Sequence, residues 1–199
     1  MNSILIVLLT VLVLGVLPNA LNTIAVSGII ILLLLKFKNL YKSPILWYLS
    51  FFILGLLIIA FYQSPYLKLI SGGMVGYGFF LVVMFAGVIP NKWYLTRRLK
   101  KNRGVLSVLG FITITPHAFL HIFGFFETID LFGIAAYVIM IPLTIVSFQV
   151  IKREIDPKDW LTIQKAAYGI YLLLFVHLLF VSSWENKIIY AVLLTLYVN

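Results

Sequence analysis

The chain has 199 residues, of which 63% are hydrophobic and only 11% are charged, and its mean hydropathy is +1.11. These values lie outside the range of soluble globular domains and inside that of multi-spanning membrane proteins. The formal net charge is +9, and the chain has no cysteine. The missing cysteine excludes disulfides, thiolate metal sites and iron–sulfur clusters ligated by this chain.

A membrane-spanning helix needs roughly 20 mostly apolar residues. Breaks at charged residues and at proline, glycine and asparagine give eight candidate spans: 3–18, 20–36, 45–62, 68–90, 104–125, 130–151, 160–182 and 186–198. The first run has no basic segment before it and is followed by a weak processing site, so we expect a retained helix and not a signal peptide. The sequence therefore predicts an all-α, polytopic transmembrane helical bundle of about eight helices, which forms a single integral membrane domain over residues 1–199.

The distribution of basic residues predicts the topology. With the N-terminus inside, the inner loops carry 13 of the 15 lysines and arginines, and only Lys68 and Lys187 fall outside. This bias, together with contact with anionic lipid headgroups, accounts for the net charge, and we expect no nucleic-acid binding. The inner loop predicted at 92–103 has six basic residues, which could serve only as topology signals or could also dock an acidic electron donor.

The fourth candidate span, 68–90, contains Gly72 and Gly76 one helical turn apart. Small residues at this spacing allow two helices to approach closely. We therefore expect close packing along this span.

All three histidines, His117, His121 and His177, fall within the fifth and seventh candidate spans, whereas all six acidic residues fall in loops or at helix ends. Ionisable side chains in the hydrocarbon region are costly and indicate function by default. The alternative is that neutral histidines only join helices through hydrogen bonds, each worth about 0.6 kcal/mol. His117 and His121 have the spacing of a zinc-protease motif, but Ala118 stands where that motif needs its glutamate, which argues against a zinc site.

Axial ligation of haem by one histidine from each of two facing helices is the remaining use of imidazole in a helical bundle. His117 follows Arg103 by 14 residues, about 21 Å along the helix axis, and His177 follows Lys165 by 12 residues, about 18 Å. The two histidines are thus expected at the same depth. His121 lies one turn further out on the same face and is the reserve ligand, and Pro116 could turn His117 toward its partner.

Four motifs in this region occur in a recognisable order: "SGGMVGYGFFLVVMFAGVIPNKW", "RRLKKNRGVLSVLGFITITPHAFLH", "PLTIVS" and "WLTIQKAAYGIYLLLFVH". Together they resemble the ferric-reductase-like transmembrane domain family, most closely its haem-b membrane subunits of bacterial methionine sulfoxide reductase systems. The similarity covers a haem-binding core at 68–182, with two additional helices before it. The resemblance implies one bis-histidine haem b, with His117 and His177 as iron ligands and His121 close to the cofactor.

One departure concerns Gln164, because two-haem members of the family have a second iron-ligating histidine at this position. The resemblance therefore implies one haem, with a second site absent or rebuilt. The sequence has no nicotinamide or flavin motif of its own. We expect an electron-transfer subunit in the bacterial cytoplasmic membrane that receives electrons from a separate flavoprotein or quinol and passes them to an acceptor protein at the outer face. A cofactor-free permease and a scaffold subunit of a larger membrane complex are the alternatives.

Overall fold

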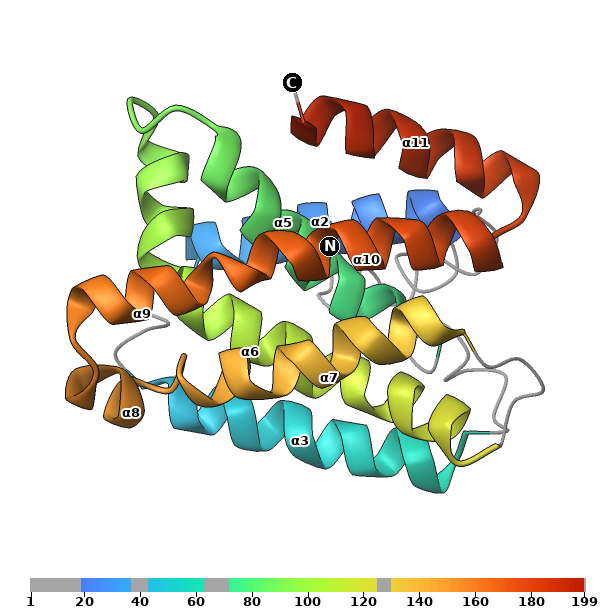
Figure 1. Ribbon diagram of the computed structural model, residues 1–199, viewed down its shortest axis with the longest axis horizontal. Coiled ribbons are helices and arrows are strands. Elements are labelled where there is room, and N and C mark those ends of the chain that lie inside the picture. Colours follow the sequence, from blue (N-terminus) through green and yellow to red (C-terminus); the bar gives the residue numbers. More distant parts are fainter. Residues whose placement is uncertain (1–18, 37–42, 63–71, 125–129, 199) are drawn as a thin grey trace, which may run out of the picture.

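The computed structural model describes residues 19–36, 43–62, 72–124 and 130–198, and all regular structure within these ranges is helical (Figure 1). The predicted all-α class is confirmed. The predicted first span, 3–18, lies outside the described residues. The helices are α2 (Asn19–Lys36), α3 (Pro44–Ala60), α5 (Met74–Val88), α6 (Tyr94–Ile122), α7 (Leu131–Ile145), α8 (Gln149–Glu154), α9 (Pro157–Gln164), α10 (Ala166–Val181) and α11 (Trp184–Val198).

Two predicted boundaries are wrong. The basic segment predicted as a loop at 92–103 is helical from Tyr94 onward, because lysine and arginine are good helix formers, and α6 continues for 29 residues. The predicted span 130–151 is divided, since α7 ends at Ile145 and α8 begins at Gln149. The predicted span 160–182 agrees with the apolar helical run Pro157–Val181, which is formed by α9 and α10 on either side of Lys165.

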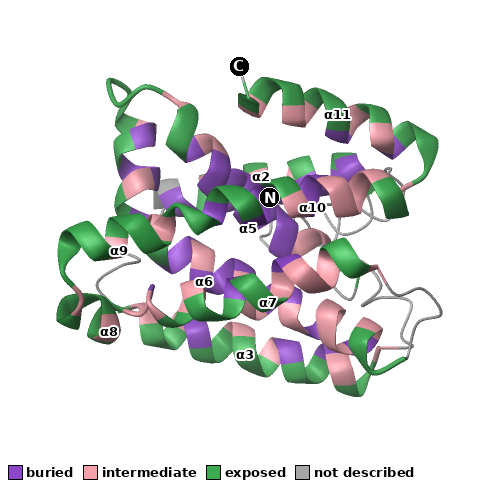
Figure 2. Cartoon of the chain, viewed as in Figure 1, coloured by how far each residue is buried: buried purple, intermediate pink, exposed green. Residues whose placement is uncertain are grey.

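Helix α5 is the centre of the bundle and packs between α2 and α6. Ten of its 15 residues are buried, and Figure 2 shows this central position. A Cβ atom added to Gly76 would lie 2.8 Å from the backbone nitrogen of Ile114 in α6, and one added to Gly78 would lie 2.7 Å from Val26 in α2. The glycines therefore allow both neighbours to approach the backbone of α5 closely, as predicted for Gly76.

The other helices pack around this core: α3 and α7 against α6, α10 against α7, and α11 against α10 and α2. A buried polar contact joins the ends of the described chain, because the side-chain oxygen of Asn186 accepts a 2.8 Å hydrogen bond from the amide of Ala20. This amide lies in the first turn of α2, where no helical carbonyl is available to it. Asn186 thus satisfies a helix end and links α11 to α2.

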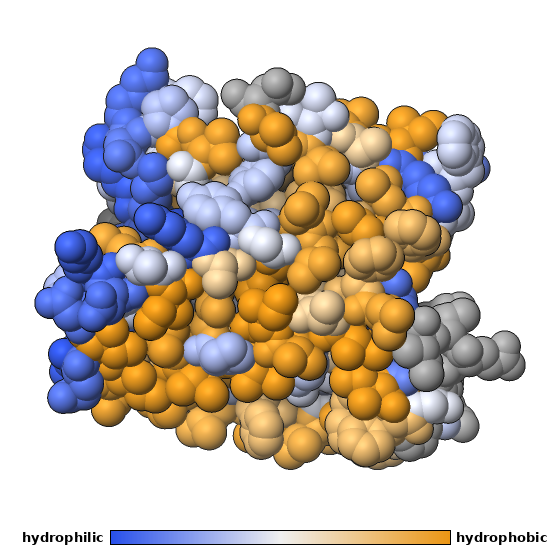
Figure 3. Space-filling model, viewed as in Figure 1, coloured by the Kyte–Doolittle hydropathy of each residue, from blue (hydrophilic) through white to orange (hydrophobic). Residues whose placement is uncertain are grey.

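Among the residues that the structure describes, two helical runs are long and apolar enough to cross a membrane: α6, and Pro157–Val181, formed by α9 and α10. A core helix of a soluble protein meets the same criteria of length and composition. In Figure 3, hydrophilic residues gather at the end of the molecule that holds α8 and α9, and a broad hydrophobic surface covers the middle.

Candidate functional site

The three histidines lie around one cavity of about 350 Å³, which we call the histidine cavity. Its walls come mainly from the first halves of α2, α5, α7 and α11, the end of α6 and the second half of α10. The volume lies at the lower end of the roughly 300–1,000 Å³ typical of small-molecule sites. His117, His121, His177 and Asp130 all line it, so the structure brings together side chains that are up to 60 positions apart in the sequence.

His117 is positioned by close packing on both sides of its helix. Pro116, the residue before it, lies inside α6, and its ring is near enough to α3 that a Cβ on Gly55 would be 3.3 Å from the proline Cγ. On the cavity side, the imidazole ring of His117 lies against Gly73. A Cβ added to Gly73 would be 3.1 Å from two atoms of this imidazole ring. Gly73 also has a positive φ of 78°, a conformation that glycine adopts without strain. The close contact with His117 and the positive φ both favour glycine at position 73, directly before α5.

The ring of His117 lies beside those of both other histidines. Its centroid is 4.5 Å from that of His121 and 6.3 Å from that of His177, with interplanar angles of 63° and 65°. His117 and His121 belong to successive turns of α6, whereas His177 comes from α10. The ring contact between α6 and α10 is thus between His117 and His177.

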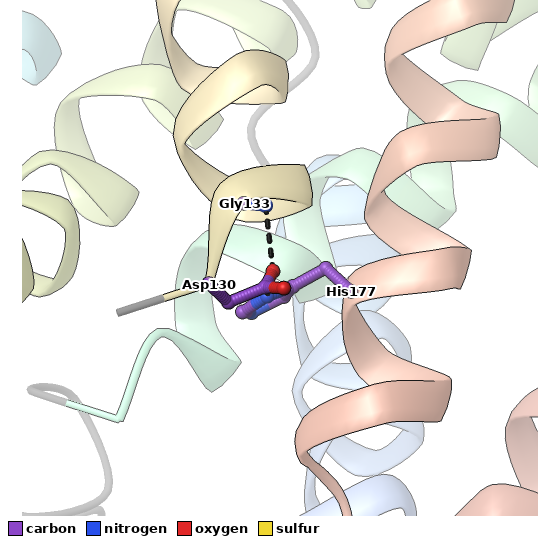
Figure 4. A network of polar contacts seen from close by, with 3 residues as sticks. All are labelled: Asp130, Gly133 and His177. Carbon is purple, nitrogen blue, oxygen red and sulfur yellow. Dashed lines mark hydrogen bonds and ion pairs between the residues drawn. The ribbon is translucent and has the colours of Figure 1, made fainter. Parts of the chain in front are cut away.

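The orientation of His177 is set by Asp130, the residue that caps the N-terminus of α7. One carboxylate oxygen, Oδ2, lies 2.6 Å from Nδ1 of His177 and accepts a 2.7 Å hydrogen bond from the amide of Gly133 (Figure 4). Both side chains are about four-fifths buried, with 18% of His177 and 19% of Asp130 exposed. The carboxylate therefore stabilises a helix end and orients an imidazole ring at the same time.

The pKa of the Asp130 carboxyl, which lies just before α7, reflects two opposed effects. Burial acts to raise it, while the hydrogen bonds with His177 and Gly133 and the attraction of the imidazole act to lower it. The net result is a pKa below the ordinary value for aspartate. Asp130 is therefore ionised at neutral pH and available as the acceptor for a proton on Nδ1 of His177.

Gly133 leaves room for this contact. A Cβ at position 133 would lie 2.9 Å from Nδ1 and 3.1 Å from Cε1 of His177, closer than ordinary van der Waals contact. The start of α7 and the ring of His177 thus approach each other more closely than any other amino acid at position 133 would permit.

The described residues form no group of three or more histidine, cysteine or acidic side chains placed to hold a metal ion. The zinc-protease interpretation of His117 and His121 therefore gains no support. Haem needs only two axial ligands from the protein. An imidazole nitrogen lies about 2 Å from a bound first-row metal and about 1.2 Å from its own ring centre, so two rings on opposite sides of one metal have centres roughly 6.4 Å apart. The 6.3 Å between His117 and His177 is close to this value, and it is also usual for two aromatic rings in direct edge-to-face contact.

Gln164, the residue that the resemblance places at a second haem position, does not line the histidine cavity. Its side-chain amide donates a 3.3 Å hydrogen bond to the hydroxyl of Ser147. Both residues line another cavity, of about 440 Å³, and none of the described residues around that cavity is a histidine. The donor set there does not fit a bis-histidine haem.

Asp130 is the member of the site that the sequence analysis missed. The sequence places it with the other acidic residues, in loops or at helix ends, and gives it no role in the site. The sequence does contain one signal for it, because an aspartate directly before the apolar run at 131–145 is typical of an N-cap. That signal predicts the helix start but not the contact with His177, 47 positions away.

No protein-family model matches the sequence, and neither a curated protein nor a solved structure matches the chain. The similarity to ferric-reductase-like membrane domains therefore stands on the four sequence motifs, and the functional argument on the geometry of the histidine cavity.

Proposed function

We propose that the chain is a multi-pass transmembrane b-type cytochrome subunit that holds one haem between His117 and His177. The observation that carries this proposal is the 6.3 Å separation of the two ring centres across a cavity. The cavity that both rings line supports a bound group at this place.

The surface supports a location in the membrane. Only 28% of the most apolar window of Pro157–Val181 is buried inside the bundle, so most of this apolar helix faces outward. Helix α3 likewise exposes large apolar side chains along its length, including Leu46, Phe52, Ile53 and Leu56, each more than half exposed. Soluble monomers rarely expose continuous apolar patches of this extent. The proposed environment is the hydrocarbon of the bacterial cytoplasmic membrane.

The charged ends of the helices support the predicted orientation. The basic start of α6 and the basic helix α8 contribute to the same cavity, so these positively charged segments lie at one end of the bundle. The histidine cavity is formed by the opposite end of α6. With the positive end inside, the haem site would lie toward the outer face.

The residues of the site have distinct roles in this proposal. Asp130 accepts the proton on Nδ1 of His177, which leaves Nε2 of His177 as the ligand atom and makes it a stronger donor. His117 supplies the second ligand, and Gly73 and Pro116 hold its ring in place. Met140 and Leu174 belong to the apolar part of the wall, which limits the access of water. When bound, haem supplies a one-electron carrier.

The direction of electron flow follows from the proposed orientation. Electrons would arrive at the basic inner end from a separate flavoprotein or quinol and leave to an acceptor protein at the outer face, near the histidine cavity. The lysines and arginines of α6 would attract an acidic donor protein. The chain would then be the electron-transfer subunit of an oxidoreductase system.

Optical spectroscopy of the purified protein tests the proposal. Protein in detergent, loaded with haem, is expected to show a sharp Soret band that shifts on reduction with dithionite. The band should disappear in His117→Ala and in His177→Ala and persist in His121→Ala. A band that persists in His177→Ala would exclude the ligand assignment, and an absence of haem binding by the wild-type protein would favour a cofactor-free permease or scaffold subunit.

A further inference from the structure

The second cavity, lined by Gln164 and Ser147, has a strongly basic wall, and we call it the basic cavity. Lys100, Lys101 and Arg103 of α6 contribute to it together with Lys152 of α8. None of the described residues that line it is acidic. Among the described residues, the wall of this cavity therefore has four cations and no carboxylate.

The interior of the basic cavity is apolar. Phe80, Val83, Met140, Leu143 and Ile170 line it, and these residues come from α5, α7 and α10 at the core of the bundle. The lining thus combines cationic groups from the ends of α6 and α8 with hydrocarbon side chains deeper inside. Such a combination suits a ligand with an anionic head and an apolar tail.

Two of the cationic side chains are already held at the wall by aromatic residues. The ammonium group of Lys152 lies 3.9 Å from the ring centroid of Trp160, within the range of a cation–π contact. The guanidinium group of Arg103 interacts with the hydroxyl of Tyr171. Both aromatic residues line the same cavity, so the two positive charges are positioned beside it. The Ser147 and Gln164 pair adds a hydroxyl and an amide as further hydrogen-bonding groups.

We propose that the basic cavity binds one acidic phospholipid, with its phosphate between the cations of α6 and α8 and an acyl chain against the apolar wall. This inference rests on the membrane location proposed above and is independent of haem binding. Basic pockets between transmembrane helices on the positively charged side are suited to anionic headgroups. The +9 charge of the chain and the absence of an acidic lining residue favour an anionic ligand over a zwitterionic one.

A free phosphate has the same anionic chemistry but cannot use the apolar wall. The acyl chain of a phospholipid would fill the space beside Leu143 and Ile170, which water would otherwise occupy at a cost in free energy. We therefore expect binding to need both parts of the lipid.

Native mass spectrometry of the delipidated full-length protein, after titration with phosphatidylglycerol or phosphatidylcholine, tests this proposal. The cavity variant is Lys152→Gln combined with Arg103→Gln. The matched control is Lys92→Gln combined with Arg153→Gln, which removes the same charge from two exposed residues that do not line the cavity. Each cation near an acidic headgroup changes lipid affinity roughly five-fold, so the cavity variant is expected to bind phosphatidylglycerol about 25-fold more weakly.

The wild-type protein and the control variant should each retain one tightly bound phosphatidylglycerol, and phosphatidylcholine should bind much more weakly. The proposal is overturned if the cavity and control variants lose affinity equally, if the two lipids bind alike, or if excess inorganic phosphate alone displaces phosphatidylglycerol. The single variant Lys152→Gln provides the same comparison with Arg153→Gln if the double variant does not fold, because Lys152 is exposed on a short helix. Haem absorbance should be the same in all these variants, which separates this result from the test of the haem site.

Discussion

Replacement of Gly133 by alanine tests the geometry of the histidine cavity with a single added methyl group. The new Cβ would lie 2.9 Å from Nδ1 of His177, whereas ordinary contacts begin at 3.4 Å, so the ring has to move by about half an ångström. The same methyl group would lie 3.3 Å from Oδ2 of Asp130. The 2.6 Å distance between Asp130 Oδ2 and His177 Nδ1 must therefore increase, or the imidazole ring must rotate.

A shift of this size is large for a metal site, because ligands are held within about 0.5 Å of their working geometry. Loss of the partner that orients a ligating histidine lowers metal affinity about 10- to 100-fold. We expect Gly133→Ala to weaken haem binding by at least about ten-fold, measured by titration of the apoprotein with haemin and absorbance in the Soret region.

Gly169→Ala is the matched control, because Gly169 lies on α10, the helix of His177, and nothing is within 4 Å of its added Cβ. This variant should bind haem like the wild type and gain up to about 1 kcal/mol of helix stability. Equal haem affinity in Gly133→Ala and Gly169→Ala would refute the argument that the start of α7 positions His177.

Three further predictions concern single residues. Asp130→Asn should weaken haem binding about ten-fold and raise the midpoint potential of the haem in a redox titration, because His177 loses its carboxylate partner. The control Asp156→Asn, at the N-cap of α9, should change neither the haem affinity nor the midpoint potential. Gly76→Ala should lower stability by about 1–3 kcal/mol in a thermal unfolding experiment, because its methyl group meets the backbone of α6, whereas Gly87→Ala meets nothing within 4 Å and should not be destabilising. Asn186→Ala should cost about 1–3 kcal/mol in the same assay by leaving a buried amide of α2 without an acceptor, and an unchanged unfolding temperature would contradict the proposed link between α2 and α11.

The sequence predicted the helical class because apolar runs separated by charged residues and proline are a strong local signal. Helices α2 and α3 begin and end within one or two residues of the predicted spans. The start of α6 was not predictable in the same way. Charge marks which side of the membrane a segment occupies, but lysine and arginine also continue a helix, so the basic segment extended α6 instead of ending it.

The relative depth of the histidines was predictable, because the position of a residue along a helix can be counted from the charged residues at its end. Similar numbers of residues from the charged ends, 14 and 12, placed His117 and His177 at nearly one level, and the structure has their rings side by side. The contribution of Asp130 depends on how α7 and α10 pack, and no periodicity along the chain contains that information. The same is true of Gly133, whose role follows from a close approach between two helices.

Electron paramagnetic resonance of the oxidised, haem-loaded protein tests the proposed ligation most directly, because the spin state of the iron reports its two axial ligands. We predict a low-spin spectrum typical of two imidazole ligands, and we predict that this low-spin signal is lost in His117→Ala and in His177→Ala. A high-spin spectrum from the wild-type protein, or a low-spin spectrum that survives the loss of either histidine, would contradict the account.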